Sequence, residues 1–220
     1  MRRLLAFTLL IVAIAAALPL GRAASATPDP GKRLAAALLT AASEHNAKHI
    51  WLLLSKPSQR RLGPTFAAFK RTNAGRIEGA LVPFETTSVK LFLDRTLSAR
   101  FGIVAMRSGV RSIAFPLRRE SRRWKIETPG PIQIAILGPR PASSGRVSQI
   151  AFEASAPAPI DDAIIFVDGK LYPPNLAPSG KKATVYITLP KPLKRGVHIA
   201  VAYAFQGTNV SALAWSFGST

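Results

Sequence analysis

Two histidines and an asparagine near the N-terminus are the clearest candidates for ligand chemistry. In "SEHNAKH" (residues 43–49), His45 and His49 are four residues apart, so they share one face of a helix. That face continues an apolar stripe, and Asn46 falls on the adjoining apolar arc. Imidazole and amide groups in such a position would hydrogen-bond a ligand inside a pocket. The alternative is that the three side chains are exposed or bonded to nearby backbone.

Neither a metal site nor an acid–base pair is evident around these residues. The two histidines supply only two metal ligands, and the nearby Glu44 lies on another helix face. We expect Glu120 and Glu127 to lie in a hairpin turn or to point outward, so no pair is placed for general acid–base work. The sequence therefore predicts no cofactor, no metal and no enzymatic activity. The acids of this half are Glu44, Glu78, Glu85, Asp94, Glu120 and Glu127.

Residues 1–26 have the layout of a secretory signal peptide. A basic start, "MRR", precedes an apolar run over residues 4–20, and Ala24 and Ala26 supply small residues before a cleavage point. This layout predicts export to the cell envelope or the medium, with cleavage after Ala26. The alternative is a retained N-terminal anchor, which would be the protein's contact with the membrane. The chain has no cysteine, which excludes thiolate metal ligands and a lipid-modified cysteine.

The chain is strongly basic, with 30 Lys and Arg against 11 acids and a formal net charge of +19. Such a charge favours acidic partners. Because export removes the protein from chromosomal nucleic acid, we expect an anionic envelope polymer or another protein as the partner instead. The stretch "FPLRRESRRWKIE" (residues 115–127) contributes four candidate contacts, and the alternative is that they form a solvated turn that shields a sheet rim. These four are Arg118, Arg119, Arg122 and Arg123.

Helices must position the histidines, and a β-meander follows them. Apolar spacing predicts a long helix over 30–54, and residues 55–64 are expected to break it. Further short helices are predicted over 65–71 and 74–81. The pattern then changes to alternation, which predicts an antiparallel sheet and an α+β unit. The predicted strands span residues 88–94, 98–106, 111–119 and 122–127.

The part after "TPGP" (residues 128–131) shows no helical periodicity. Six or seven short strand-like segments, separated by turn residues, follow in about 90 residues, which is typical of a small β-sandwich. The sequence therefore predicts a signal peptide over 1–26, an α+β domain over 27–129 and an all-β domain over 130–220.

The first half resembles the NTF2-like superfamily, whose members form a cone of helices over an antiparallel sheet. The resemblance covers residues 32–128 and is carried by the long helix, "WLLLSKPSQRRLG", "FAAF" and "IAFPLRRESRRWKIE". In such folds polar residues of the long helix often point into a cup, which here implies a pocket lined by six residues. These are His45, Asn46, His49, Phe66, Phe69 and Phe115.

The second half resembles a bacterial Ig-like domain over residues 130–220. The carrying segments are "FVDGKLY", "PLKRGVHIAVAYA" and "SALAWSF", and the cysteine pair of antibody-type domains is missing. Ig-like modules commonly serve as spacers or adhesion units. We therefore expect an exported, non-catalytic protein that binds or organises a partner. The alternative is a small-ligand-binding or enzymatic cup.

Overall fold

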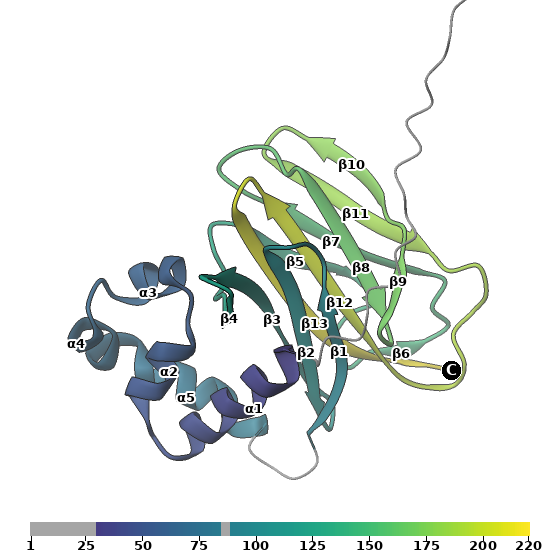
Figure 1. Ribbon diagram of the computed structural model, residues 1–220. Coiled ribbons are helices and arrows are strands. Elements are labelled where there is room, and N and C mark those ends of the chain that lie inside the picture. Colours follow the sequence, from purple (N-terminus) through teal and green to yellow (C-terminus); the bar gives the residue numbers. More distant parts are fainter. Residues whose placement is uncertain (1–29, 85–88) are drawn as a thin grey trace, which may run out of the picture.

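The computed structural model describes residues 30–84 and 89–220, which form four stacked layers (Figure 1). A helical layer covers one face of a four-stranded sheet, β1–β4, which we call the meander sheet. The other face of the meander sheet packs against a β-sandwich. The sandwich consists of an inner sheet, next to the meander sheet, and an outer sheet.

Short helices with one buried face make up the helical layer. Ala35, Leu38, Ala41 and Ala42 are buried on α1 and pack against the meander sheet, as the apolar stripe predicts. The elements are α1 (Pro30–Ser43), α2 (Ala47–Leu53), α3 (Lys56–Leu62), α4 (Phe66–Phe69), a π-helical turn η1 (Lys70–Ala74), α5 (Gly75–Leu81) and a 3₁₀ turn η2 (Val82–Phe84).

The predicted long helix is wrong in two respects. It ends at Ser43, because His45 has a left-handed φ of 51° and the chain closes in a Schellman motif. In this motif the amides of His45 and Asn46 donate to the carbonyls of Ala42 and Ala41, over 3.0 and 2.8 Å. The predicted break at 55–64 contains a helix of its own, α3, whose first turn is capped by the Ser55 side chain.

The meander sheet is buried on both faces. Val104 and Met106 face the helices, whereas Leu93, Ile103 and Ala105 face the sandwich. This confirms the predicted order of helices followed by an antiparallel sheet. Its strands are β1 (Lys90–Thr96), β2 (Phe101–Ser108), β3 (Arg111–Glu120) and β4 (Arg123–Ile126).

The second part is a β-sandwich whose strand order is that of an Ig-like domain, as predicted. The outer sheet has the order β10 (Asn175–Ser179), β11 (Lys182–Thr188), β7 (Gln149–Ser155), β5 (Gln133–Gly138). The inner sheet has the order β6 (Ser144–Gly145), β13 (Asn209–Ser219), β12 (Gly196–Gln206), β8 (Asp162–Val167), β9 (Lys170–Tyr172).

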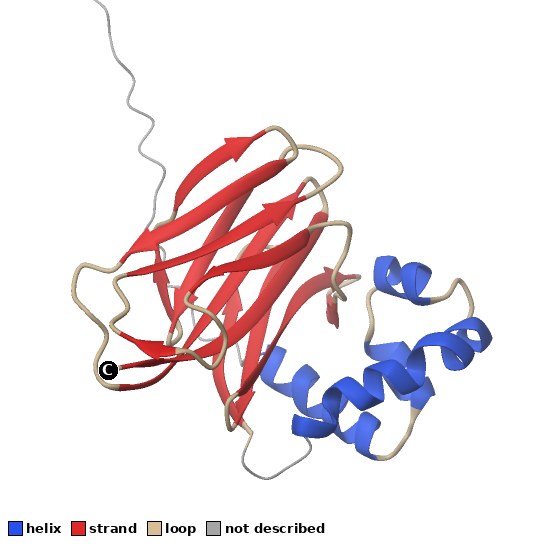
Figure 2. Ribbon diagram, turned by 180° about the vertical axis from the view of Figure 1, so that it is seen from behind, coloured by secondary structure: helices blue, strands red, loops and turns tan. Residues whose placement is uncertain are grey.

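An apolar interface joins the meander sheet to the inner sheet. Ile199, Val201 and Tyr203 of β12 are at most 5% exposed and pack against buried residues of β1 and β2. The approach is close at Gly169, which has a φ of 77°, because a Cβ there would lie 2.7 Å from the carbonyl oxygen of Phe92. In Figure 2 the strands of both parts form one continuous stack beside the helices.

The predicted signal peptide lies outside the described residues, so export and cleavage stay predictions. Within residues 30–84 and 89–220, no helix is both long and apolar enough to cross a membrane.

Candidate functional site

An apolar cavity of about 250 Å³ lies where the helices, the meander sheet and β13 meet. Leu38 and Leu81 come from the helices, Ile113 and Phe115 from β3, and Leu213 from β13. Two hydroxyl groups, those of Ser112 and Thr128, interrupt the apolar wall. The remaining lining residues are Leu54, Ile77, Ala80, Ala114, Ile126, Pro129, Ala212 and Ala214.

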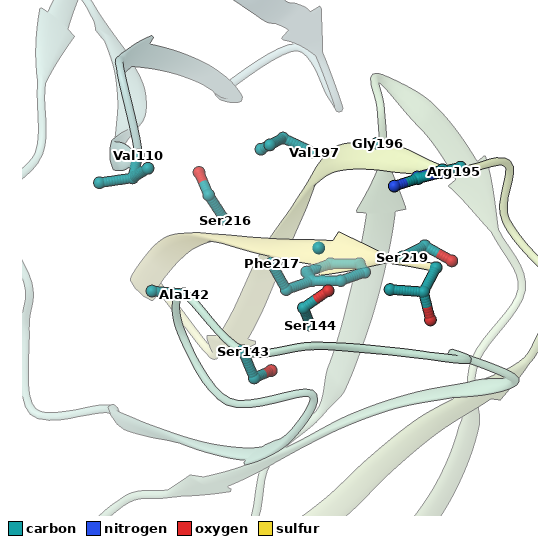
Figure 3. A pocket seen from close by; sticks show the side chains of 12 residues that line it. Val110, Ala142, Ser143, Ser144, Arg195, Gly196, Val197, Ser216, Phe217 and Ser219 are labelled. Carbon is teal, nitrogen blue, oxygen red and sulfur yellow. The ribbon is translucent and has the colours of Figure 1, made fainter.

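Two further cavities extend this one along β13. The first, of about 560 Å³, shares five lining residues with it and opens toward Arg111 and Pro141. The second, of about 360 Å³, is a shallow hollow beside the C-terminal half of β13, where Figure 3 shows Arg195 at one end and Val110 at the other. We call the three together the edge groove. The residues shared by the first two cavities are Ala80, Ser112, Ile113, Leu213 and Ala214.

The edge groove follows a strand edge that is largely unpaired. On that side β13 pairs with β6 only at Gly218 and Ser219. In an antiparallel ladder, residues that bond to the partner strand alternate with residues whose amide groups point away. The Gly218 amide donates to Ser143 and the Ser216 carbonyl accepts from Ala142, so these residues point away from β12. By the same alternation Ala212 and Ala214 point outward, and no described strand pairs with them there.

A buried carboxylate lies near the junction of the layers. Glu127 is 1% exposed and carries three charged or polar partners. Its oxygens accept from Arg61 Nη2 at 2.7 Å, from Arg118 Nε at 2.6 Å and from Ser55 Oγ at 2.6 Å. Arg118 also donates to the carbonyl of Thr208 in the β12–β13 turn, over 2.6 Å, so this cluster ties the meander sheet to the sandwich. We call these four residues, Ser55, Arg61, Arg118 and Glu127, the Glu127 cluster.

The partners of Glu127 keep it ionised. Burial on its own raises the pKa of the carboxyl, but hydrogen bonds from Ser55, Arg118 and Arg61 together outweigh it and hold the pKa below the ordinary value of 4.5. The described residues contain no cluster of three or more metal-ligating side chains around it or elsewhere. The expectation that Glu127 points outward is wrong, because directly after the end of β4 its side chain turns toward Ser55 and Arg61 of the α3 segment rather than toward solvent.

Two buried hydroxyls have no hydrogen-bond partner among the described residues, Thr128 Oγ1 and the hydroxyl of Tyr203. Burial raises the pKa of Tyr203 well above its ordinary value of 10, so the phenol stays neutral. Thr128 is also one of the residues that line the edge groove.

The structure does not bring His45, Asn46 and His49 into a pocket. All three are exposed, and none lines the edge groove. Asn46 caps α2 by accepting the amide of His49 at 2.9 Å, and His45 Nδ1 lies 3.1 Å from Glu78 Oε2. The prediction that these residues line a cup is wrong, because the chain turns at His45 and rotates them to the surface.

The three phenylalanines predicted to line a pocket have separate roles. Phe115 lines the edge groove, which is a different pocket from the predicted one because none of the three polar residues lines it. Phe69 is fully buried against Trp51, with ring centroids 5.0 Å apart, and Phe66 lies under the ammonium group of Lys48 at 4.7 Å. Of these rings, the groove uses only Phe115.

The four arginines of the β3–β4 hairpin divide into one structural residue and three surface residues. Arg118 belongs to the Glu127 cluster, and its side chain is 15% exposed. The prediction that Arg118 is a surface contact is therefore wrong. Arg119, Arg122 and Arg123 are exposed, and Arg119 lies over the ring of Trp124. Among the acids weighed for catalysis, Glu85 lies outside the described residues.

Sequence reasoning missed most of the groove, although one signal was present. The runs "IAVAYAF" (residues 199–205) and "SALAWSF" (residues 211–217) are apolar or small at almost every position rather than at alternate ones. Such a run indicates a strand covered on both faces. It would have predicted that another layer packs on the sandwich, and hence a junction where a groove forms.

Solved structures of Ig domains are similar to part of this chain. Neither the protein-family models nor the curated proteins contain a match to this chain. Among solved structures, a complex of a titin Ig domain with obscurin-like 1 is 16% identical over 40% of this chain and 93% of that chain, with a TM-score of 0.27. A titin Ig tandem is 7% identical over 60% and 80%, with a TM-score of 0.28. These are similarities to Ig domains over part of the chain, and the Ig-like assignment of the sandwich rests on its strand order.

Proposed function

We propose that this chain is an exported, non-catalytic binding protein whose edge groove receives its partner. The observation that carries the proposal is the groove itself, an apolar channel at the junction of three layers that follows the largely unpaired edge of β13. Apolar cavities with a few polar groups are the usual sites of ligand binding in proteins. Export rests on the layout of residues 1–26.

The proposal includes an NTF2-like origin for the first part. Helices over one face of an antiparallel sheet are consistent with that origin, and the apolar cavity lies between these two layers. The cup that the resemblance implies would then be reached from the side of β13 rather than from the histidines.

Filling the groove at Ala80 tests the proposed function. Ala80 is exposed on α5 and lines the cavities of about 250 and 560 Å³, so Ala80→Phe places a ring in the groove without disturbing the core. We expect wild type to bind a neutral apolar dye such as Nile red, and A80F to bind it at least about tenfold more weakly, a change of about 1.4 kcal/mol. Fluorescence titration measures both.

The matched control is Ala36→Phe, at an exposed position of α1 that lines none of the three cavities. A36F should bind the dye as wild type does. Equal binding by A80F and wild type, or no binding by either, would contradict a ligand site in the groove.

An anionic envelope polymer is a second candidate partner, favoured by the exposed Arg119, Arg122 and Arg123 on one hairpin. Replacing these three with Ser should lower the salt concentration at which the protein elutes from a cation-exchange column, because each lost positive charge weakens the attraction to the anionic matrix. The same substitution at the distant Lys170, Lys191 and Lys194 is the control for net charge. Equal elution of the two variants would argue against a contact at the hairpin.

A further inference from the structure

We propose that the edge groove binds an extended, acidic segment of a partner protein, which adds as a strand to the free edge of β13. This inference rests on the proposed function and deepens it by naming the class of partner.

The unpaired backbone of β13 favours a polypeptide over other apolar ligands. Ala212 and Ala214 direct amide and carbonyl groups toward the groove, two residues apart, and Ala212 and Ala214 are only 7% and 6% exposed. Buried backbone groups without partners are costly, and an exposed strand edge is a template for another chain. An extended peptide supplies donors and acceptors with the same spacing. The free stretch runs from Ala212 to the amide of Ser216, because the Ser216 carbonyl already accepts from Ala142, and its length is about 13 Å.

The walls of the groove suit alternate side chains of such a segment. A strand beside β13 would direct every second side chain toward the meander sheet and the helices, into the 250 Å³ cavity walled by Leu38, Leu81 and Phe115. The side chains between them would face Ile136 and Pro141 of the sandwich. The segment therefore carries apolar residues at alternate positions.

Charge at one end of the groove gives the segment its acidic character. Arg111 and Arg195 are exposed and line the end near Val110, and among the residues that the structure describes no Asp or Glu lines the three cavities. A net charge of +19 for the chain steers acidic partners toward it. An acidic residue of the segment is thus placed beside Arg111.

The test uses two labelled octapeptides of alternating Val and Thr, one ending in two Asp and the other in two Lys. Fluorescence anisotropy should show that the Asp peptide binds wild type and that the Lys peptide binds at least about tenfold more weakly. Arg111→Glu should reverse this preference. Arg100→Glu, the same charge change at an exposed residue that lines none of the three cavities, should leave it unchanged.

Ala214→Pro tests the backbone contact itself. The Ala214 amide points away from β12, so proline removes a donor of the groove and leaves the β12–β13 ladder intact. We expect A214P to lose the Asp peptide while it keeps its far-ultraviolet circular dichroism spectrum. If A214P does not fold, hydrogen exchange in wild type decides, because the Asp peptide should slow exchange of the Ala212 and Ala214 amides.

The outcomes distinguish a failure of strand addition from a failure of the proposed binding function. If Nile red binds wild type and neither peptide does, the binding site stands and strand addition is wrong. If neither dye nor peptide binds, both proposals are wrong. Binding of the peptide by folded A214P as tightly as by wild type, or unchanged exchange of the two amides, also overturns strand addition.

Discussion

Replacing Glu127 with Gln should lower the free energy of unfolding by about 3–5 kcal/mol. The carboxylate is 1% exposed and lies between two guanidinium groups. Removing its charge leaves the positive charges of Arg61 and Arg118 without a compensating negative charge in a site largely closed to water. Because their side chains are 31% and 15% exposed, water relieves part of the cost, and we expect the lower end of the range. Urea unfolding followed by circular dichroism measures the change.

Two control variants separate the effect of losing a buried charge from the effects of losing an exposed charge or a buried hydroxyl. Glu153→Gln makes the same change in an exposed pair with Lys182, where the side chains are 30% and 61% exposed, and should cost at most about 1 kcal/mol. Tyr203→Phe removes a buried hydroxyl that has no hydrogen-bond partner in the described part of the chain and should cost less than E127Q. Equal losses in E127Q and E153Q would contradict a buried, charge-compensating Glu127.

The same cluster predicts a pH dependence with a definite sign. The pKa of Glu127 is lower in the folded protein than its ordinary value of 4.5, so the folded state binds this proton less readily than the unfolded state does. Its contribution to stability is therefore complete above about pH 4.5 and is lost as the pH falls through the folded pKa. The difference in unfolding free energy between wild type and E127Q should shrink over that range. A difference that stays constant down to pH 2 would contradict this prediction.

The sequence was a good guide to elements whose signals are local. Alternation after Pro83 predicted the meander, and closely spaced turn residues predicted the sandwich; both are present. The end of α1 was missed because a Schellman turn usually has glycine at the left-handed position, and here the residue is His45. Because the helical spacing of apolar residues continues after His45, it does not reveal that the chain turns there.

Features that depend on distant partners could not be predicted in the same way. Glu127 meets Arg61, 66 residues away, and nothing near either residue indicates the other. The groove depends on β3 and β13, whose serines at 112 and 216 hydrogen-bond to each other across 104 residues. Only the layer packing brings these segments together, and the helix periodicity that singles out His45, Asn46 and His49 carries no information about it.

The apolar interface between the meander sheet and the inner sheet predicts opposite effects of one substitution in two contexts. Val201 is fully buried at the centre of this interface. In the whole protein Val201→Lys buries an unpaired charge and should lower the free energy of unfolding by at least about 3 kcal/mol. In a fragment of residues 130–220 the same face is uncovered, so the wild-type fragment should self-associate through its exposed apolar face.

V201K should therefore reduce self-association of the fragment and lower the free energy of unfolding of the whole protein. In the 130–220 fragment, V201K adds a charge to the uncovered face and should increase the monomer fraction measured by analytical ultracentrifugation. Thr184→Lys, on the other sheet and outside the apolar clusters, is the control in both contexts and should have little effect. A monomeric wild-type fragment together with an undamaged V201K protein would show two independent domains. A V201K substitution that stabilises the monomeric fragment but destabilises the whole protein would show that the sandwich needs the meander sheet to cover it. The strand edge that borders the groove would then have its described form only when both parts of the chain are present.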